Sequence, residues 1–238
     1  MNTTPRSQNP GRTPSAFTLI EMIVVIGVIA VLAAMVFPIA GAANKKAKLT
    51  RAKAELVVVE TAIEGYKTKL GYYPPDNSPN WGLNQLYFEL LGTTNIGGGG
   101  AVVYQTLDGS AKISQSSLAS VFNPPGTISG FMNCSKGDEG AVAQNFLKNL
   151  RPGQLTELKG TPAGDIVRIL AGPVPWPDNN NYHPVNAANP TVNPWSYNSS
   201  NPRFNRSTFD LWIDIVISGQ TNRVCNWSDR PILVSTPY

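Results

Sequence analysis

One long apolar run dominates the N-terminal part of the chain. Residues 22–43 contain no Asp, Glu, Lys or Arg, and about 20 apolar residues suffice for a helix to cross a bilayer. We therefore predict a membrane-spanning helix over residues 17–43, with a kink at Pro38, where one helical hydrogen bond is lost. Glu21 lies near the start of this helix, and an acidic side chain in hydrocarbon needs a partner that the segment does not supply.

A different apolar pattern follows over residues 44–71. Apolar side chains recur there in steps of three and four, which is typical of one face of an amphipathic helix that packs on a sheet. Gly71 and the prolines after it predict the end of the helix. The apolar stripe consists of Leu49, Ala52, Leu56, Val59, Ile63, Tyr66 and Leu70.

The sequence of residues 72–238 predicts one globular domain with short secondary-structure elements and long polar loops. The clearest strand covers residues 209–217, where apolar residues alternate with a second face that contains Asp210 and Asp214. Residues 172–207 are rich in Pro and Asn and predict a loop outside the core. The other predicted elements are helices over 81–91 and 138–150, strands over 154–159 and 165–171, a turn at 218–222 and an edge strand over 231–234.

These patterns together predict an α+β fold. The outer half of the long N-terminal helix packs on a small C-terminal antiparallel sheet, and a loop-rich insertion occupies residues 95–207.

Basic residues are concentrated beside the apolar run. Residues 44–70 contain seven Lys or Arg and three Glu, whereas residues 71–238 contain ten basic and eleven acidic residues. A basic band next to a membrane helix suits anionic lipid headgroups. The nearly neutral domain disfavours nucleic acid as a partner.

No pattern for catalysis or for a transition metal is found in the sequence. Neither a His-Glu-x-x-His nor a Gly-x-Ser-x-Gly motif occurs, and His183 is the single histidine. We therefore do not expect an enzyme. Cys134 and Cys225 lack the spacing of a zinc site, and they are a candidate disulfide if the domain lies outside the cytoplasm.

The N-terminus carries a resemblance to a known family. Residues 15–22, Ser-Ala-Phe-Thr-Leu-Ile-Glu-Met, together with the apolar run and its proline, resemble the start of type IV prepilins and type II secretion pseudopilins. The resemblance implies that a prepilin peptidase removes residues 1–16 by cutting between Ala16 and Phe17, and that the new Phe17 amine is methylated. It also implies that Glu21 pairs with the amine of a neighbouring subunit. The family's usual residue before the cut is Gly, and here it is Ala16.

The same resemblance implies a location and a set of partners. The helix would cross the bacterial inner membrane once, with residues 72–238 in the periplasm, although the positive-inside rule alone would keep the basic flank in the cytoplasm. The partners would be the lipid bilayer, other pilin or pseudopilin subunits and an inner-membrane assembly platform. The product would be a pseudopilus that serves type II secretion, and the sequence does not distinguish it from a surface pilus.

An ordinary secretory signal peptide is the alternative for the N-terminus. Ala40-Gly41-Ala42 is a small-x-small site that a signal peptidase cuts. However, the apolar run is longer than a usual signal-peptide core, and Glu21 would then have no role. A mature chain that begins at Phe17 favours the pilin interpretation, and one that begins at Ala43 or the next residue favours the signal peptide.

The C-terminal part is also similar to the major pseudopilins. Residues 194–195 (Pro-Trp), 209–212 (Phe-Asp-Leu-Trp) and 226–227 (Asn-Trp) carry the resemblance, as do residues 70–74 and 82–83 after the long helix. Members of the family often hold Ca²⁺ in this region, which makes Asp210, Asp214 and Asp229 weak candidate ligands. Asn193 stands where the family has Asp, and the turn at 218–222 has no acidic residue. Apart from this calcium, no cofactor is expected.

A ligand-binding protein is the second hypothesis for function. The N-terminus would then serve only as an anchor, and the domain would bind a glycan or another ligand. Several aromatic residues lie among Pro and Asn and could form such a surface, although rings of this kind also anchor loops to a core. They are Trp176, Tyr182, Trp195, Tyr197 and Trp227.

Overall fold

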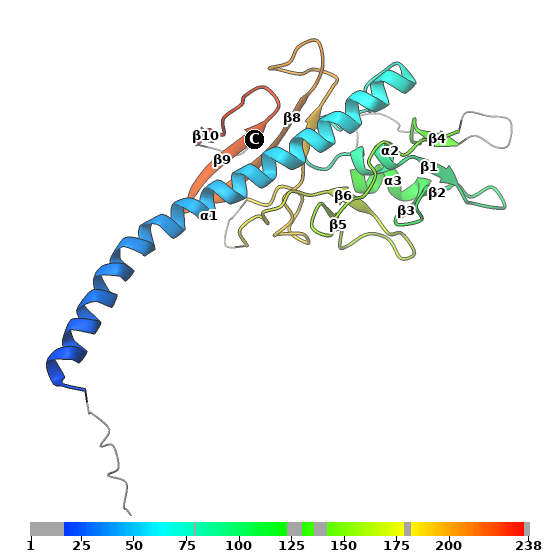
Figure 1. Ribbon diagram of the computed structural model, residues 1–238. Coiled ribbons are helices and arrows are strands. Elements are labelled where there is room, and N and C mark those ends of the chain that lie inside the picture. Colours follow the sequence, from blue (N-terminus) through cyan, green and yellow to red (C-terminus); the bar gives the residue numbers. More distant parts are fainter. Residues whose placement is uncertain (1–16, 79, 123–129, 136–141, 179–181, 236–238) are drawn as a thin grey trace, which may run out of the picture. The chain divides into compact units, whose positions relative to one another are not determined.

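The computed structural model describes residues 17–78, 80–122, 130–135, 142–178 and 182–235, apart from the side chains of residues 35–40. The chain divides into two units, residues 1–44 and residues 45–238. The predicted α+β class is confirmed (Figure 1). The helices are α1 (Leu19–Leu70), α2 (Leu86–Leu91) and α3 (Gln115–Phe122). The strands are β1 (Thr93–Asn95), β2 (Val103–Thr106), β3 (Lys112–Ser114), β4 (Cys134–Ser135), β5 (Leu155–Glu157), β6 (Arg168–Leu170), β7 (Ser196–Asn198), β8 (Asp210–Ile217), β9 (Gln220–Cys225) and β10 (Ile232–Val234).

Helix α1 is 52 residues long and ends where the sequence predicts. Gly71 has a φ of 89°, and its backbone N–H donates to the Lys67 carbonyl at 2.8 Å. A residue with a Cβ is strained at that φ, so glycine ends the helix at low conformational cost.

The predicted amphipathic stripe of α1 is confirmed as the helix face that enters the core. Ala52, Ile63 and Tyr66 are 0% exposed, and Leu56 is 1% exposed. In Figure 1 this part of α1, coloured light blue to cyan, runs across β8 and β9. The whole stripe is buried or partly buried in one apolar core: Leu49, Ala52, Leu56, Val59, Ile63, Tyr66 and Leu70.

The C-terminal sheet is antiparallel, with strand order β10-β9-β8-β7. Strands β8 and β9 form a hairpin whose turn consists of Ser218 and Gly219, at φ values of 52° and 76°. Positive φ at both residues matches the twist of the flanking strands. The turn is therefore shorter than the predicted 218–222. The predicted edge strand at 231–234 is confirmed as β10.

The predicted strand at 209–217 is confirmed as β8, and both of its faces are covered, because the first six residues of the strand are all buried. Asp210 accepts hydrogen bonds from backbone N–H groups of a loop. Asp214 forms an ion pair with Arg223, and the Trp212 ring packs edge-on against Trp227. The alternation along β8 separates apolar from polar side chains, and both kinds find partners inside the domain.

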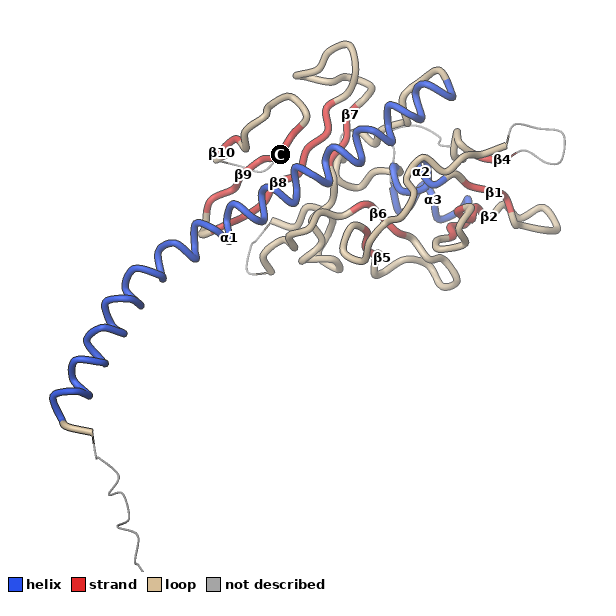
Figure 2. The backbone as a smooth tube through the Cα atoms, in the orientation of Figure 1, coloured by secondary structure: helices blue, strands red, loops and turns tan. Residues whose placement is uncertain are grey.

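The insertion contains more strand than the sequence predicts. A second four-stranded sheet has the order β3-β2-β1-β4, with a parallel pairing of β1 and β4, and β5 pairs with β6 in a separate ladder. Figure 2 shows these strands in a group apart from β7–β10, with α2 and α3 beside them.

The predicted helix at 138–150 is wrong over residues 142–150, which contain no helix; residues 138–141 lie outside the described part of the chain. Backbone groups of this segment bond to other segments. Gln144 donates its N–H to the Asn133 side chain, and Phe146 donates to the Leu90 carbonyl. The predicted helix at 81–91 is shortened to α2, because the Asn84 side chain binds the Leu86 N–H at 3.1 Å.

Glu89 joins three segments inside the domain. Its carboxylate is 0% exposed and accepts hydrogen bonds from the Tyr66 hydroxyl of α1 at 2.9 Å and from the backbone N–H groups of Met132 and Asn133 at 2.9 and 3.0 Å. Burial raises the pKa of Glu89, against the three hydrogen bonds that lower it.

The free energy of unfolding should therefore depend on pH through Glu89. A folded-state pKa above the unfolded value of about 4.5 stabilises the fold at low pH, and this contribution is lost as the pH rises through the folded pKa. We expect the stability difference between wild type and Glu89→Gln to be most favourable to wild type below about pH 4.5 and to decline at higher pH. Urea unfolding of both proteins across pH tests this, and a difference that grows with pH would contradict it.

Candidate functional site

The N-terminal end of α1 is closed by a capping box. The Thr18 backbone N–H and the Thr18 hydroxyl each donate to Glu21 Oε2 at 2.8 Å, and the Glu21 N–H donates back to Thr18 Oγ1 at 3.3 Å. This arrangement satisfies donors that have no partner within the helix. The Thr-x-x-Glu spacing of residues 18–21 is the sequence signature from which this cap could be predicted.

The predicted cleavage site is only partly within the described residues. Ala16 lies outside them, whereas Phe17 is described and is 81% exposed. Pro38 lies within α1, but its side chain is among those not described, so the predicted kink stays a prediction.

Apolar side chains near the start of α1 are exposed on every side of the helix. Each large apolar residue from Leu19 to Leu32 is more than half exposed. A helix that is apolar all round is stable only when lipid or other helices cover it. These residues are Leu19, Ile20, Met22, Ile23, Val24, Val25, Ile26, Val28, Ile29, Val31 and Leu32.

Within the described part of the chain, no helix is both long enough and apolar enough to span a membrane.

The basic band after the apolar run is partly tied to the domain. Lys53 Nζ donates to the backbone carbonyls of Cys225 and Ser228 at 3.1 and 2.8 Å. Arg51 pairs with Glu55 at 3.1 Å, and burial raises the pKa of Glu55 against this attraction. The sequence does not indicate these long-range contacts, because residues 53 and 225 are far apart in the chain.

The three candidate calcium ligands do not form a group. Asp210 binds three backbone N–H groups, those of Arg203, Phe204 and Asn205, at 2.6–3.0 Å. Among the described residues, no set of three or more His, Cys, Asp or Glu could hold a metal ion.

Asp214 and Asp229 differ in their surroundings. Asp214 receives two hydrogen bonds from the Arg223 guanidinium, at 2.8 and 2.7 Å, and the side chains of the pair are 10% and 3% exposed. Asp229 is exposed. Asn193, which stands at the family's Asp position, donates to the carbonyls of Val174 and Asp214 and so holds a loop against β8.

Cys134 and Cys225 are both free, so the candidate disulfide is not formed in this structure. Cys134 is in β4 of the insertion sheet, whereas Cys225 ends β9 in the C-terminal sheet. Burial raises the pKa of the Cys225 thiol.

The aromatic residues of the Pro- and Asn-rich segment have two different roles. Trp176, Trp195 and Tyr197 are at most 2% exposed, which confirms that rings anchor this segment to the core and corrects the expectation that it lies wholly outside. Tyr182 of the same segment is 41% exposed, and Trp227, which follows β9 outside this segment, is half-buried.

Comparison with known proteins supports the N-terminal assignment. The family described as the prokaryotic N-terminal methylation motif matches residues 12–37, which confirms the predicted prepilin-type N-terminus. Fimbrial protein Q of Moraxella bovis is 36% identical over 92 residues, which cover 35% of this chain and 59% of the relative. The match therefore spans less than two thirds of that protein's length. No solved structure is significantly similar.

The ion pair of Asp214 predicts a large effect of one substitution. Asp214→Ala leaves a guanidinium buried without this carboxylate, so we expect a loss of about 3–5 kcal/mol in the free energy of unfolding. Asp229→Ala, at an exposed position, is the matched control and should change stability by no more than about 0.5 kcal/mol. Urea unfolding measures both. A calcium-dependent stabilisation of wild type that Asp214→Ala abolishes would show instead that this aspartate serves a metal.

Proposed function

We propose that this chain is a structural subunit of a type IV pilin-like filament. The observation that carries the proposal is a helix whose apolar side chains are exposed all round, within the residues that match the prokaryotic N-terminal methylation motif. Such a helix is stable in lipid before assembly and among the equivalent helices of other subunits afterwards. Its function is mechanical, and it requires no catalytic residue.

Processing would create the form that assembles. A prepilin peptidase cuts between Ala16 and Phe17, and the Phe17 amine is then methylated. The helix crosses the inner membrane with the domain in the periplasm until an assembly platform extracts the subunit. Subunits then stack through a heterologous contact that does not close, which gives a helical filament.

Glu21 would set the register of this stacking. In the isolated chain its carboxylate is held by Thr18, one helical turn from the future N-terminus. Removal of the leader creates a positive amine at Phe17, and the Glu21 carboxylate of a neighbour is its natural partner in surroundings of low dielectric constant. The capping hydrogen bonds keep the carboxylate at the helix end until that amine arrives.

Such a filament has two candidate functions. We propose a pseudopilus for type II secretion, in line with the pseudopilin-like sequence of the C-terminal strands. The likeness to a fimbrial protein favours a surface fimbria as the second candidate. Deletion of the gene separates them: loss of exported enzymes from the medium supports secretion, and loss of material sheared from the cell surface supports a fimbria.

The role of Glu21 can be separated from its capping role by two substitutions. Glu21→Gln keeps a residue that suits a capping box but removes the charge, so the protein should insert normally and yield at least about tenfold fewer filaments. Thr18→Val removes the cap hydroxyl, costs about 0.5–2 kcal/mol at the helix end and keeps the charge, so filaments should still form. Sheared or platform-bound filaments are quantified by immunoblot against total membrane protein.

The opposite ranking of these two variants would refute the pairing. If Glu21→Gln assembled like wild type and Thr18→Val did not, the carboxylate would matter only as a helix cap.

The proposed processing predicts the first residue of the mature protein. N-terminal sequencing and mass spectrometry of membrane-extracted protein should give Phe17 with one added methyl group. Deletion of the prepilin peptidase should leave residues 1–16 attached. A mature chain that begins at Ala43 would show removal by an ordinary signal peptidase and would remove the assembly helix altogether.

A further inference from the structure

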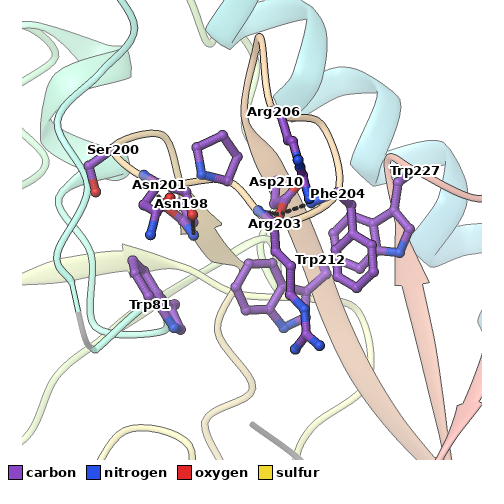
Figure 3. Close-up of a pocket in the computed structure, with 11 residues that line it drawn as sticks. Trp81, Asn198, Ser200, Asn201, Arg203, Phe204, Arg206, Asp210, Trp212 and Trp227 are labelled. Atoms are coloured by element: carbon purple, nitrogen blue, oxygen red, sulfur yellow. Dashed lines mark hydrogen bonds between the residues drawn. The ribbon is translucent and has the colours of Figure 1, made fainter.

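We propose that the globular domain carries a cleft that binds an acidic oligosaccharide. A pocket of about 650 Å³ opens beside the loop between β7 and β8, and this volume is typical of small-ligand sites. Figure 3 shows Trp81 on one side of it and Trp212, Phe204 and Trp227 on the other.

A second pocket continues the first. Its volume is about 290 Å³, and Trp81 and Trp212 line both pockets. Tyr182 lies in the second pocket and Phe204 in the first. The two pockets therefore adjoin at a pair of indoles, and together they are called the cleft here. Two adjoining pockets suit a chain of several rings better than a single small molecule.

Aromatic side chains line this cleft, and the Arg203 guanidinium lies over the Phe204 ring, 5.8 Å from its centroid. Phe204 stacks on Trp227 with ring centroids 4.3 Å apart and planes 9° from parallel, and Trp227 meets Trp212 at 5.9 Å. Phe204 is 47% exposed and Tyr182 41% exposed. Large rings that stay in contact with water in both pockets are characteristic of binding surfaces. The C–H faces of sugar rings are flat, weakly apolar surfaces that pack on such rings.

Polar side chains that line the first pocket can bind the hydroxyl and carboxylate groups of a sugar. Ser200 and Asn201 line the first pocket, where the Asn201 amide, and the Ser200 hydroxyl as an acceptor, can bond to ring hydroxyls. The Asn198 amide lines it too but is bound to the Asn201 backbone. Arg206 is exposed and also lines it, and a guanidinium forms a two-pronged contact with a carboxylate. The Asp210 carboxylate is already bound by three backbone N–H groups, so it competes little for that guanidinium. The positive charge of Arg206 therefore favours an acidic sugar at this end of the cleft.

The wall that carries these groups is fixed in place before any ligand binds. Asp76 accepts hydrogen bonds from the Ser199 N–H, the Ser200 N–H and the Ser200 hydroxyl, each at 2.8 Å. Asp210 holds the loop a few residues later. A loop held at two points loses little further entropy on binding, which favours affinity.

Nucleic acid also combines aromatic stacking with basic residues, but the rest of the domain disfavours it. Residues 71–238 contain one more acidic than basic residue, whereas binding to a phosphate backbone depends on clustered positive charge.

The test uses the full-length chain in detergent micelles and isothermal titration calorimetry. The probes are tetragalacturonate, a hyaluronan tetrasaccharide and sialyllactose, with cellotetraose and lactose as uncharged comparators. We expect at least one acidic probe to bind, and to bind at least fivefold more tightly than the uncharged sugars.

Four substitutions locate the site. Phe204→Ala should weaken binding at least fivefold, and Leu233→Ala, at an exposed apolar residue of β10 outside the pocket, should not. Arg206→Gln should abolish the preference for acidic sugars, and Arg230→Gln, at an exposed arginine outside the pocket, should leave it unchanged. Both pocket positions are exposed, so the variants should fold, and unfolding curves verify this.

Three results would overturn the proposal: no binding of any acidic probe, binding that Phe204→Ala leaves unchanged, or tighter binding of a ten-nucleotide deoxythymidine strand than of any sugar. The assay needs no filament, so its outcome is independent of the proposed assembly. Glu21→Gln should bind the sugars like wild type.

Discussion

The packing of α1 on the sheet is the contact on which the domain depends. The stripe from Ala52 to Tyr66 is buried in a core that also receives side chains from α2, α3, β6 and β8. Burial of each large apolar side chain contributes about 1.5–3 kcal/mol, and few other elements contribute as many as α1. At its end, the Tyr66 hydroxyl binds the buried Glu89 and so connects the helix to α2 and to the segment before β4.

The elements with a long periodic pattern could be predicted from the sequence. They include helix α1 and strand β8, whose side chains share the core. The stripe of α1, its end at Gly71 and strand β8 follow from periods of 3.6 and 2 and from glycine and proline signals. The prepilin-type N-terminal motif could be recognised from the sequence because its residues are contiguous in the chain.

Short elements and contacts between distant residues could not be predicted in this way. Strands β1 and β3 have three residues each, too few to show a period, and long-range pairings define them. Residues 142–150 have apolar residues at helical spacing, but their N–H groups bond to other segments. The aromatic cleft combines Trp81 with residues around 200 and 227, so its residues give no local signal. The Asp210 and Asp214 carboxylates looked like free metal ligands, although each binds donors in the fold.

In the proposed filament, the contact of Lys53 with the end of β9 would help to carry force from the helix to the sheet. A filament under tension pulls each subunit along its helix, and the helix must transmit that pull to the sheet. The Lys53 ammonium holds two carbonyls of the C-terminal strand region while the apolar stripe beside it lies along the sheet. In the proposed filament these contacts would be loaded side by side in shear, so they would resist together and would not break one after another. In such a filament Lys53 would thus act as a mechanical tie between the helix and the sheet.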